Sequence, residues 1–196
     1  NKKEEENFIK KIKTAVKNYD LVIISDYGHG IFTTKVANLI SKMKIYTSLN
    51  AQINSTNMGL HSIRKYKNID ALIINASELR HEMRDREGII HNIGKKLKKQ
   101  ISAKNITITR GRAGATSINQ KNQIINCPAF GIDTIDKIGA GDAMLAILSL
   151  CLHEKIESNV ALLLSSLAAA QSVKVMGNSS PVNKSELLKT LFHLMK

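Results

Sequence analysis

Short apolar runs alternate with amphipathic stretches through the first hundred residues, and this alternation constrains the fold more than any other feature of the sequence. Apolar side chains at three- and four-residue steps predict a helix over 4–18, and the run LVIIS at 21–25 then predicts a buried strand. The same order is repeated along the chain. Further strands are expected at 44–50, 70–75 and 105–110, and further helices at 33–43, 57–66, 76–85 and 88–102. This α/β pattern is typical of a mostly parallel sheet covered by helices on both faces.

The second half of the sequence has a different texture. The segments NITITR, GATSIN and NQIINCPA are short, rich in β-branched residues and separated by Gly or Asn turns, which predicts a strand meander. Two or three helices are then expected, over 139–154, 157–175 and 184–195. With 196 residues, 43% of them hydrophobic, and no internal repeat or proline-rich linker, we expect residues 1–196 to form a single domain.

The formal net charge of +13 raises the question of a polyanionic partner. The basic residues are scattered, however, and their densest run, KKLKK at 95–99, lies in a predicted amphipathic helix. Aromatic residues, which would stack on bases, make up only 4% of the chain. We therefore expect a solvated basic surface and no nucleic acid partner.

The cysteines and the hydropathy are those of a cytoplasmic protein. Cys127 and Cys151 give neither a disulfide framework nor a paired metal spacing. Apolar runs stay shorter than the roughly 20 residues that cross a bilayer. We therefore expect a cytoplasmic location and no membrane partner.

Polar residues and glycines follow the expected strands at their carboxyl ends, where ligands bind in parallel α/β sheets. Because these ends meet at one edge of the sheet, we expect one shared site that can hold phosphate groups. The residues concerned are Asp26 and Gly28 after the first strand, Asn50 after the second, Asn75 and Glu78 after the third, and Thr109 to Gly114 after the fourth.

The segment GAGD at 139–142 opens the first helix of the second half. Glycines let successive backbone N–H groups turn toward one point, and the start of a helix adds its positive dipole, so this turn can form an anion hole. A carboxylate beside that hole, Asp142, could accept the proton of an attacking hydroxyl. Taken alone, the segment is equally compatible with a tight turn followed by an acid that stabilises the helix dipole. Neither a Walker A loop nor a complete dinucleotide fingerprint occurs in the sequence.

Four segments together resemble one family. DKIGAGDA at 136–143 resembles the D-T-x-G-A-G-D signature of the ribokinase or PfkB carbohydrate kinases, NASE at 75–78 their N-x-x-E motif, and TRGRAG at 109–114 their T-x-G-x-x-G segment. SDYGHGIF at 25–32 is similar to a stretch of the heptose-phosphate kinases in this family. The resemblance extends from about residue 20 to the end, and is strongest to a subgroup often joined to nucleotidyltransferases.

The resemblance implies a ribokinase-like three-layer α/β/α fold with a mostly parallel central sheet. The family's sugar-binding N-terminal part and its β lid have no counterpart in this sequence. Since the first residue is Asn1 rather than Met, we expect the natural chain to be longer.

The resemblance also implies an ATP- and Mg²⁺-dependent kinase that phosphorylates a hydroxyl of a sugar or sugar phosphate. Asp142 would be the catalytic base, and the amides of Gly139, Ala140 and Gly141 would stabilise the transferring phosphate. Asn75 would organise the phosphates, and Glu78 the metal, through water.

Further positions of the nucleotide site follow from the same resemblance. Thr109, Gly111 and Gly114 would line the nucleotide groove, although these glycines could also serve a turn between strands. Gly177 ends a segment of small residues expected near the adenine. Asp136 would hold the loop or assist the cation.

On the acceptor side, Asp26, Gly28 and Asn50 are the candidate substrate contacts. Two departures from the family pattern stand out: Lys137 replaces the usual Thr, and LNAQ at 49–52 replaces the DPK of heptose-phosphate kinases. The alternative function is a non-catalytic fragment or degenerate kinase domain that acts as a nucleotide-binding or assembly module for a nucleotidyltransferase partner. A homo-oligomer is compatible with either function.

Overall fold

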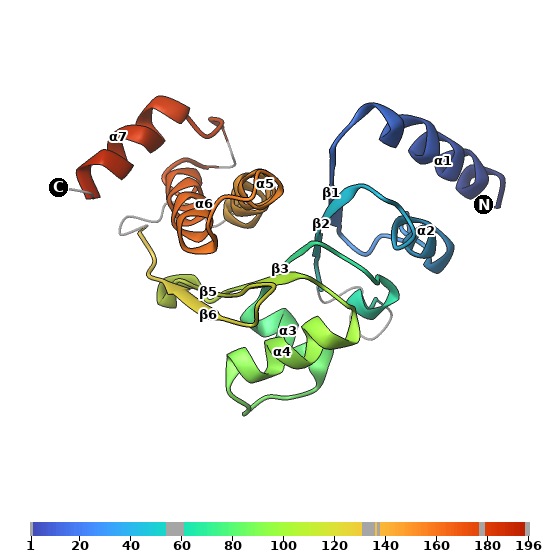
Figure 1. Ribbon diagram of the computed structural model, residues 1–196, viewed down its shortest axis with the longest axis horizontal. Coiled ribbons are helices and arrows are strands. Elements are labelled where there is room, and N and C mark those ends of the chain that lie inside the picture. The colour runs from blue at the N-terminus through green and yellow to red at the C-terminus, as the bar shows by residue number, and fades with distance from the viewer. Residues whose placement is uncertain (1, 54–60, 131–135, 137, 177–178, 195–196) are drawn as a thin grey trace. The chain divides into compact units, whose positions relative to one another are not determined.

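A computed structural model describes residues 2–53, 61–130, 136, 138–176 and 179–194 (Figure 1). The chain divides into two compact units, residues 1–106 and 107–196. Six strands are hydrogen-bonded in the order β1-β2-β3-β4-β5-β6. That residues 1–196 form one domain stays a prediction.

The first unit is built on parallel strands flanked by helices. Its strands are β1 (Leu21–Asp26), β2 (Tyr46–Ala51) and β3 (Ala71–Asn75), and β4 (Asn105–Thr109) crosses into the second unit. Its helical segments are α1 (Lys2–Ala15), η1 (Val16–Asn18), α2 (Thr34–Ile40), η2 (Ile63–Lys65), α3 (Ala76–Met83) and α4 (Ile90–Gln100). Thr33 caps α2 by accepting from the Val36 amide at 3.2 Å. Apart from the segment 57–66, these elements confirm the expected order.

Parallel pairing places the carboxyl ends of the first three strands at one edge. β1 pairs with β2 so that Ser25 lies opposite Asn50, and β2 pairs with β3 so that Asn50 lies opposite Ile73. The apolar residues of β3 are all buried, as expected of a parallel strand covered on both faces. Polar residues at the strand ends of this unit therefore share one side of its sheet.

The helix expected over 57–66 is wrong for the part that the structure describes. Residues 61–66 contain only the short 3₁₀ turn η2, with extended backbone at Ser62 and Tyr66. In an α-helix, side chains four residues apart lie on the same face. Here Ser62 reaches the carboxylate of Glu82, whereas Tyr66 reaches that of Asp26. Binding to two separate carboxylates overrides the weak helical periodicity.

The second unit joins a small antiparallel pair to three helices. Strands β5 (Ala115–Ile118) and β6 (Ile124–Cys127) pair antiparallel, which confirms the expected meander. The helices are α5 (Ala140–His153), α6 (Ser158–Ser172) and α7 (Lys184–Leu194), and a 3₁₀ turn, η3 (Gly111–Ala113), precedes β5. Helix α6 packs against α5, α7 and the β5–β6 pair (Figure 1).

Within the described residues, no helix combines the length and the apolar character needed to cross a membrane.

Candidate functional site

The turn before α5 places a glycine at the capping position of the helix. Gly139 has φ 84° and ψ −12°, a left-handed conformation that favours glycine. The Ala143 amide donates to the Gly139 carbonyl at 2.9 Å, so the N–H groups before Ala143 precede the regular helical ladder. Gly139, at the capping position, has no side chain that could accept a hydrogen bond from these amides. A Cβ built on Gly141 would have no described heavy atom within 4 Å, so a ligand can approach closely.

Asp136 and Asp142 flank this turn. The Asp136 carboxylate accepts the Ile138 amide at 3.0 Å, so Asp136 bonds within the turn. Asp142 lies half-buried in the first turn of α5. Since Gly139 occupies the capping position, Asp142 is not the cap, although its charge still favours the helix dipole. Both interpretations of Asp142 stay compatible with the geometry.

The TRGRAG segment forms the turn between β4 and β5, and its two glycines have different reasons to be glycine. Gly111 has φ 56°, and a Cβ there would meet no described heavy atom within 4 Å. Gly114 has φ 79°, and a Cβ there would lie 2.0 Å from the Cys127 carbonyl oxygen. Gly114 is therefore required by packing against the end of β6. At Gly111, only the backbone conformation favours glycine.

Asn75 and Glu78 form a capping box at the start of α3. The Asn75 side chain accepts the Glu78 amide at 2.8 Å, and the Glu78 carboxylate accepts the Asn75 amide at 3.0 Å. The other carboxylate oxygen accepts the Ile53 amide at 3.4 Å. Burial raises the pKa of Glu78, and the two amides oppose that shift. The N-x-x-E pair thus has a structural role, whatever it does for a ligand.

The donor set around Glu78 suits a hard cation that keeps most of its water. In the described part of the chain, no three His, Cys, Asp or Glu side chains gather into a metal-binding group. Mg²⁺ is commonly held by one or two carboxylates with waters and substrate phosphates as its remaining ligands. One carboxylate oriented by two amides fits that requirement.

The candidate acceptor contacts, Asp26, Gly28 and Asn50, form hydrogen bonds within the first unit. Asp26 is 2% exposed, and its carboxylate accepts the Gly28 amide at 2.9 Å and the Tyr66 hydroxyl at 2.7 Å. The buried Asn50 side chain donates to the Ile73 carbonyl at 3.0 Å. Gly28 has φ 73°. These residues shape the strand ends from within rather than presenting their polar groups to solvent.

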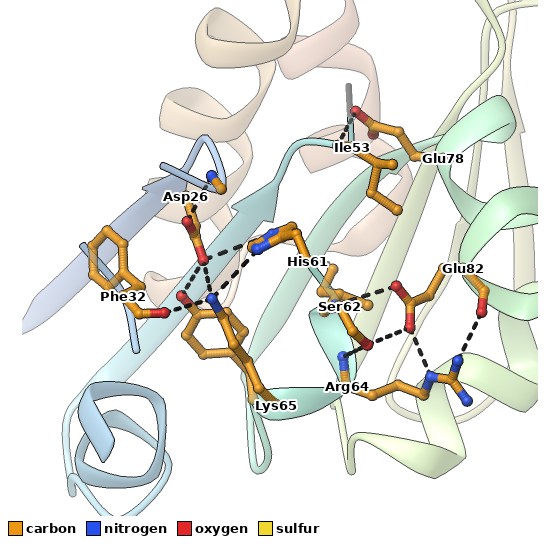
Figure 2. Close-up of polar contacts among 12 residues, drawn as sticks. Asp26, Phe32, Ile53, His61, Ser62, Arg64, Lys65, Glu78 and Glu82 are labelled. Carbon is orange, nitrogen blue, oxygen red and sulfur yellow. Dashed lines mark hydrogen bonds and ion pairs between the residues drawn. The ribbon is translucent and has the colours of Figure 1, made fainter. Parts of the chain in front are cut away.

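A cluster of side chains that the sequence did not reveal surrounds Asp26 (Figure 2). Lys65 Nζ lies 2.8 Å from Asp26 Oδ2, donates to the Phe32 carbonyl at 2.6 Å and lies 3.5 Å from His61 Nδ1. His61 Nε2 lies 3.8 Å from Asp26 Oδ2. Tyr66 follows Asp26 by 40 residues in the sequence. No short-range sequence spacing could therefore predict this contact.

Burial and charge act in opposite directions on these groups. Burial would raise the pKa of Asp26, but hydrogen bonds from Lys65, Tyr66 and Gly28 outweigh it and lower that pKa. Burial, reinforced by the bond to Asp26, raises the pKa of Tyr66. Burial also lowers the pKa of His61, against the attraction of Asp26. Asp26 is therefore a carboxylate anion held by a cation and a neutral phenol.

A second carboxylate, that of Glu82, bonds to residues 62–64, which lie between His61 and Lys65 in the sequence. It accepts the Ser62 hydroxyl at 2.7 Å, the Ile63 amide at 3.2 Å and Arg64 Nε at 2.7 Å (Figure 2). Glu82 lies one turn after Glu78 on α3. Helix α3 therefore fixes residue 53 through one carboxylate and residues 62–64 through the next.

Each unit thus brings part of the expected site together. Asp26, Gly28, Asn50, Asn75 and Glu78 lie at the carboxyl ends of β1, β2 and β3 in the first unit. Residues 109–114 and 136–142 belong to the second. Lys137 and Gly177 lie outside the described residues. One site shared by both units stays a prediction.

Curated relatives of this chain are bifunctional proteins. The chain is similar to the bifunctional protein HldE of Campylobacter jejuni strain RM1221, with 32% identity over 169 residues that cover 84% of this chain and 35% of that protein. It is 27% identical over 177 residues to the bifunctional protein HldE of Histophilus somni strain 129Pt, covering 89% of this chain and 36% of that protein. The chain spans about a third of the length of these relatives.

Solved structures confirm the fold expected from the resemblance. Escherichia coli phosphofructokinase-2 in complex with substrates and products matches with a TM-score of 0.79 and 16% identity, covering 97% of this chain and 63% of that one. Arabidopsis thaliana ribokinase complexed with ribose and ATP matches with a TM-score of 0.73 and 21% identity, covering 90% and 57%. These neighbours have the ribokinase-like α/β/α fold with a mostly parallel sheet.

The family comparison covers nearly the whole chain. Residues 2–185 match the family described as pfkB family carbohydrate kinase. This match includes the segments 75–78, 109–114 and 136–143 that carried the resemblance. The chain therefore belongs to the pfkB family of carbohydrate kinases.

Proposed function

We propose that the protein is an ATP-dependent kinase that transfers the γ-phosphoryl group to a hydroxyl of a sugar or sugar phosphate. One observation supports this most strongly: the helix start at Gly139–Asp142 has glycine at the capping position and places backbone amides and a carboxylate in the same turn. The family match supports phosphoryl transfer as the reaction.

Asp142 and the glycine turn divide the chemistry between them. Asp142 accepts the proton of the acceptor hydroxyl as its oxygen bonds to the γ-phosphorus and the bond from that phosphorus to the bridging oxygen of ADP breaks. The amides of Gly139, Ala140 and Gly141 stabilise the charge on the phosphoryl oxygens. Mg²⁺, when bound, would neutralise phosphate charge. Glu78 would hold it through water, while Asn75 keeps that carboxylate oriented.

The remaining nucleotide contacts are proposed from the family pattern. Thr109 and Gly111 would line the groove for the nucleotide, and Gly177 would lie near the adenine. Lys137 would add a cation close to the phosphates. For Gly114, the contact with the Cys127 carbonyl supports an indirect role in shaping this groove.

The acceptor is proposed to be a heptose-like sugar phosphate, and the natural partner a nucleotidyltransferase. The sequence resemblance of residues 25–32 to heptose-phosphate kinases supports the first part. The likeness to bifunctional relatives, of which this chain spans only part, supports a fused second activity. A cytoplasmic location fits the expected nucleotide substrate.

Binding of the nucleotide can be tested apart from turnover. Mg-ATP should raise the melting temperature of this chain, as any ligand selective for the native state does. The absence of a shift at saturating Mg-ATP would favour the alternative, an assembly module without nucleotide binding.

Asp142→Asn tests the catalytic assignment in the full-length protein. Its turnover with ATP and a panel of six- and seven-carbon sugar phosphates should fall about 10²- to 10⁴-fold, the usual contribution of a general base. Its Mg-ATP affinity should change little. Glu186→Gln, which removes an acid from the first turn of α7, is the matched control and should retain full turnover. Equal turnover in the Asp142 variant and wild type would remove Asp142 from its role.

A further inference from the structure

The loop after β1 is tied down at both ends by a buried ion pair. Near the start of this loop, residues 27–32, the Gly28 amide donates to Asp26 Oδ1 at 2.9 Å. At its end, the Phe32 carbonyl accepts from Lys65 Nζ at 2.6 Å. Lys65 and Asp26 lie 2.8 Å apart, so the two tethers join (Figure 2). We call residues 27–32 the β1 loop.

The burial of this ion pair indicates that it fixes the position of the groups it joins more than it stabilises the fold. The side chain of Asp26 is 2% exposed and that of Lys65 17%. Tyr66, itself fully buried, donates to the same oxygen that Lys65 contacts. Buried ion pairs often add little net stability compared with apolar residues of similar volume, and in some proteins they instead fix one arrangement of the groups they join. The arrangement held here is that of the β1 loop.

The β1 loop has the form of a ligand-binding loop rather than a plain connection. Gly28 and Gly30 have φ angles of 73° and 86°, so the loop follows a path that favours glycine. Around His29, it presents Tyr27 at 42% exposure and Ile31 at 63%. Aromatic and apolar side chains beside backbone polar groups suit the faces and hydroxyls of a sugar ring.

The position of the β1 loop assigns it to the acceptor rather than to the transferred phosphate. It lies directly beyond the carboxyl end of β1, the edge at which ligands bind in such sheets. Strand β1 is separated from β3, which carries Asn75, by two strand spacings, or about 10 Å. The β1 loop and Asn75 can therefore contact opposite ends of one small substrate.

We propose that Lys65 is a positioning residue for acceptor binding. Its ammonium group holds the β1 loop in the conformation that receives a sugar or sugar phosphate, without touching the reacting atoms. The identity of this ligand rests on the proposed function, whereas the tether itself does not. Loss of the tether should weaken acceptor binding and leave nucleotide binding intact.

The first experiment measures the tether itself by amide hydrogen exchange in the full-length protein. Lys65→Met should accelerate exchange in peptides covering residues 27–32 about tenfold, because the loop loses one anchor. Lys65→Arg, which keeps the cation, should stay close to wild type. The matched control is Lys67→Met, since Lys67 also donates to a carbonyl, that of Gln100, away from this loop. Equal exchange in the Lys65→Met and Lys67→Met proteins would overturn the proposal.

The second experiment separates acceptor from nucleotide, with the same panel of six- and seven-carbon sugar phosphates. Lys65→Met should raise the KM for the acceptor about tenfold and change the KM for ATP less than about twofold, with Lys65→Arg restoring most of the loss. Equal rises in both KM values, or no change in either, would contradict the acceptor role.

Two further outcomes are distinguishable. If wild type phosphorylates no acceptor on the panel, the proposed function fails, while hydrogen exchange still decides whether the tether exists. If Lys65→Met does not fold, Gly30→Ala acts on the loop directly: its φ of 86° strains any side chain, and a Cβ there meets no described atom within 4 Å. That variant should show the same selective rise in the acceptor KM, and an unchanged KM would overturn the loop's role.

Discussion

At the scale of single residues, the Asp26 carboxylate bonds to Gly28, Tyr66 and Lys65, while His61 lies beside it without a hydrogen bond to it. Tyr66 and Lys65 both bond to Oδ2, and His61 Nε2 is left 3.8 Å away, too far for a hydrogen bond. Among the described atoms, this buried His61 nitrogen has no hydrogen-bond partner. With Lys65 facing Nδ1, the neutral ring is best placed with Nδ1 as acceptor and its proton on Nε2. The charged groups facing this ring are Asp26, Lys65 and Glu82.

The buried environment of His61 predicts that this residue makes the free energy of unfolding depend on pH. Because burial lowers the pKa of His61 in the folded state, the unfolded chain takes up the proton first as the pH falls. Wild type should therefore lose stability between about pH 7.5 and pH 5, relative to His61→Gln. Urea unfolding of both proteins across that range measures the difference.

Comparison with the variant is essential, because Glu78 acts in the opposite direction. Its raised folded-state pKa makes stability fall as the pH rises above the ordinary carboxyl range. That contribution is present in both proteins and cancels in the difference. His29→Gln, which removes an exposed imidazole, is the control and should follow wild type. A pH dependence that persists unchanged in His61→Gln would contradict the assignment.

At the scale of elements, most of the helices and strands that could be predicted were predicted from the local sequence pattern. The periodic residues of 76–85 became α3, which ends where Arg84 adopts φ 51°, and Asn75 before it became the cap. The parallel strands were recognisable from their buried apolar runs. The segment 61–66 was not, because its conformation depends on Asp26 and Glu82, which come from other elements. The candidate site shows the same contrast. Its glycines and helix caps could be recognised in the sequence, whereas the cluster around Lys65 could not, because its members come from different elements.

The turn between β4 and β5 provides a prediction at this scale. Gly114→Ala should destabilise the protein by about 2 to 5 kcal/mol, because the new Cβ meets the Cys127 carbonyl in a left-handed conformation. Gly111→Ala should cost about 1 kcal/mol, since only the conformation is strained. Urea unfolding gives both values. Equal losses in the two variants would show that the close approach to β6 is relieved by movement of the turn.

At the scale of the whole molecule, β1 is the end strand of the described sheet. Its sequence, LVIISD, reads as a buried strand, yet Ile23 is 41% exposed. An apolar edge strand can pair with another chain unless a charge, a bulge or a covering segment prevents it. The sequence could predict that the strand is apolar but not that it lies at an edge, because strand order depends on long-range pairing.

Ile23→Lys should reduce self-association of the 196-residue chain, because a lysine on an edge strand disfavours pairing. Light scattering over a range of protein concentrations measures the effect. Ile156→Lys is the matched control, since Ile156 is 40% exposed but lies between α5 and α6 rather than on a strand. A similar reduction in both variants would indicate a general effect of added charge.

The division into two units has a practical optical consequence. The chain contains no tryptophan, and its four tyrosines, Tyr19, Tyr27, Tyr46 and Tyr66, all precede residue 107. Tyrosine absorbance and tyrosine fluorescence therefore follow only the first unit, with the phenol buried against Asp26 as an internal reporter. Circular dichroism of the peptide bonds follows both units. Superposition of the two melting curves would show, without any label, that both units unfold in one cooperative step.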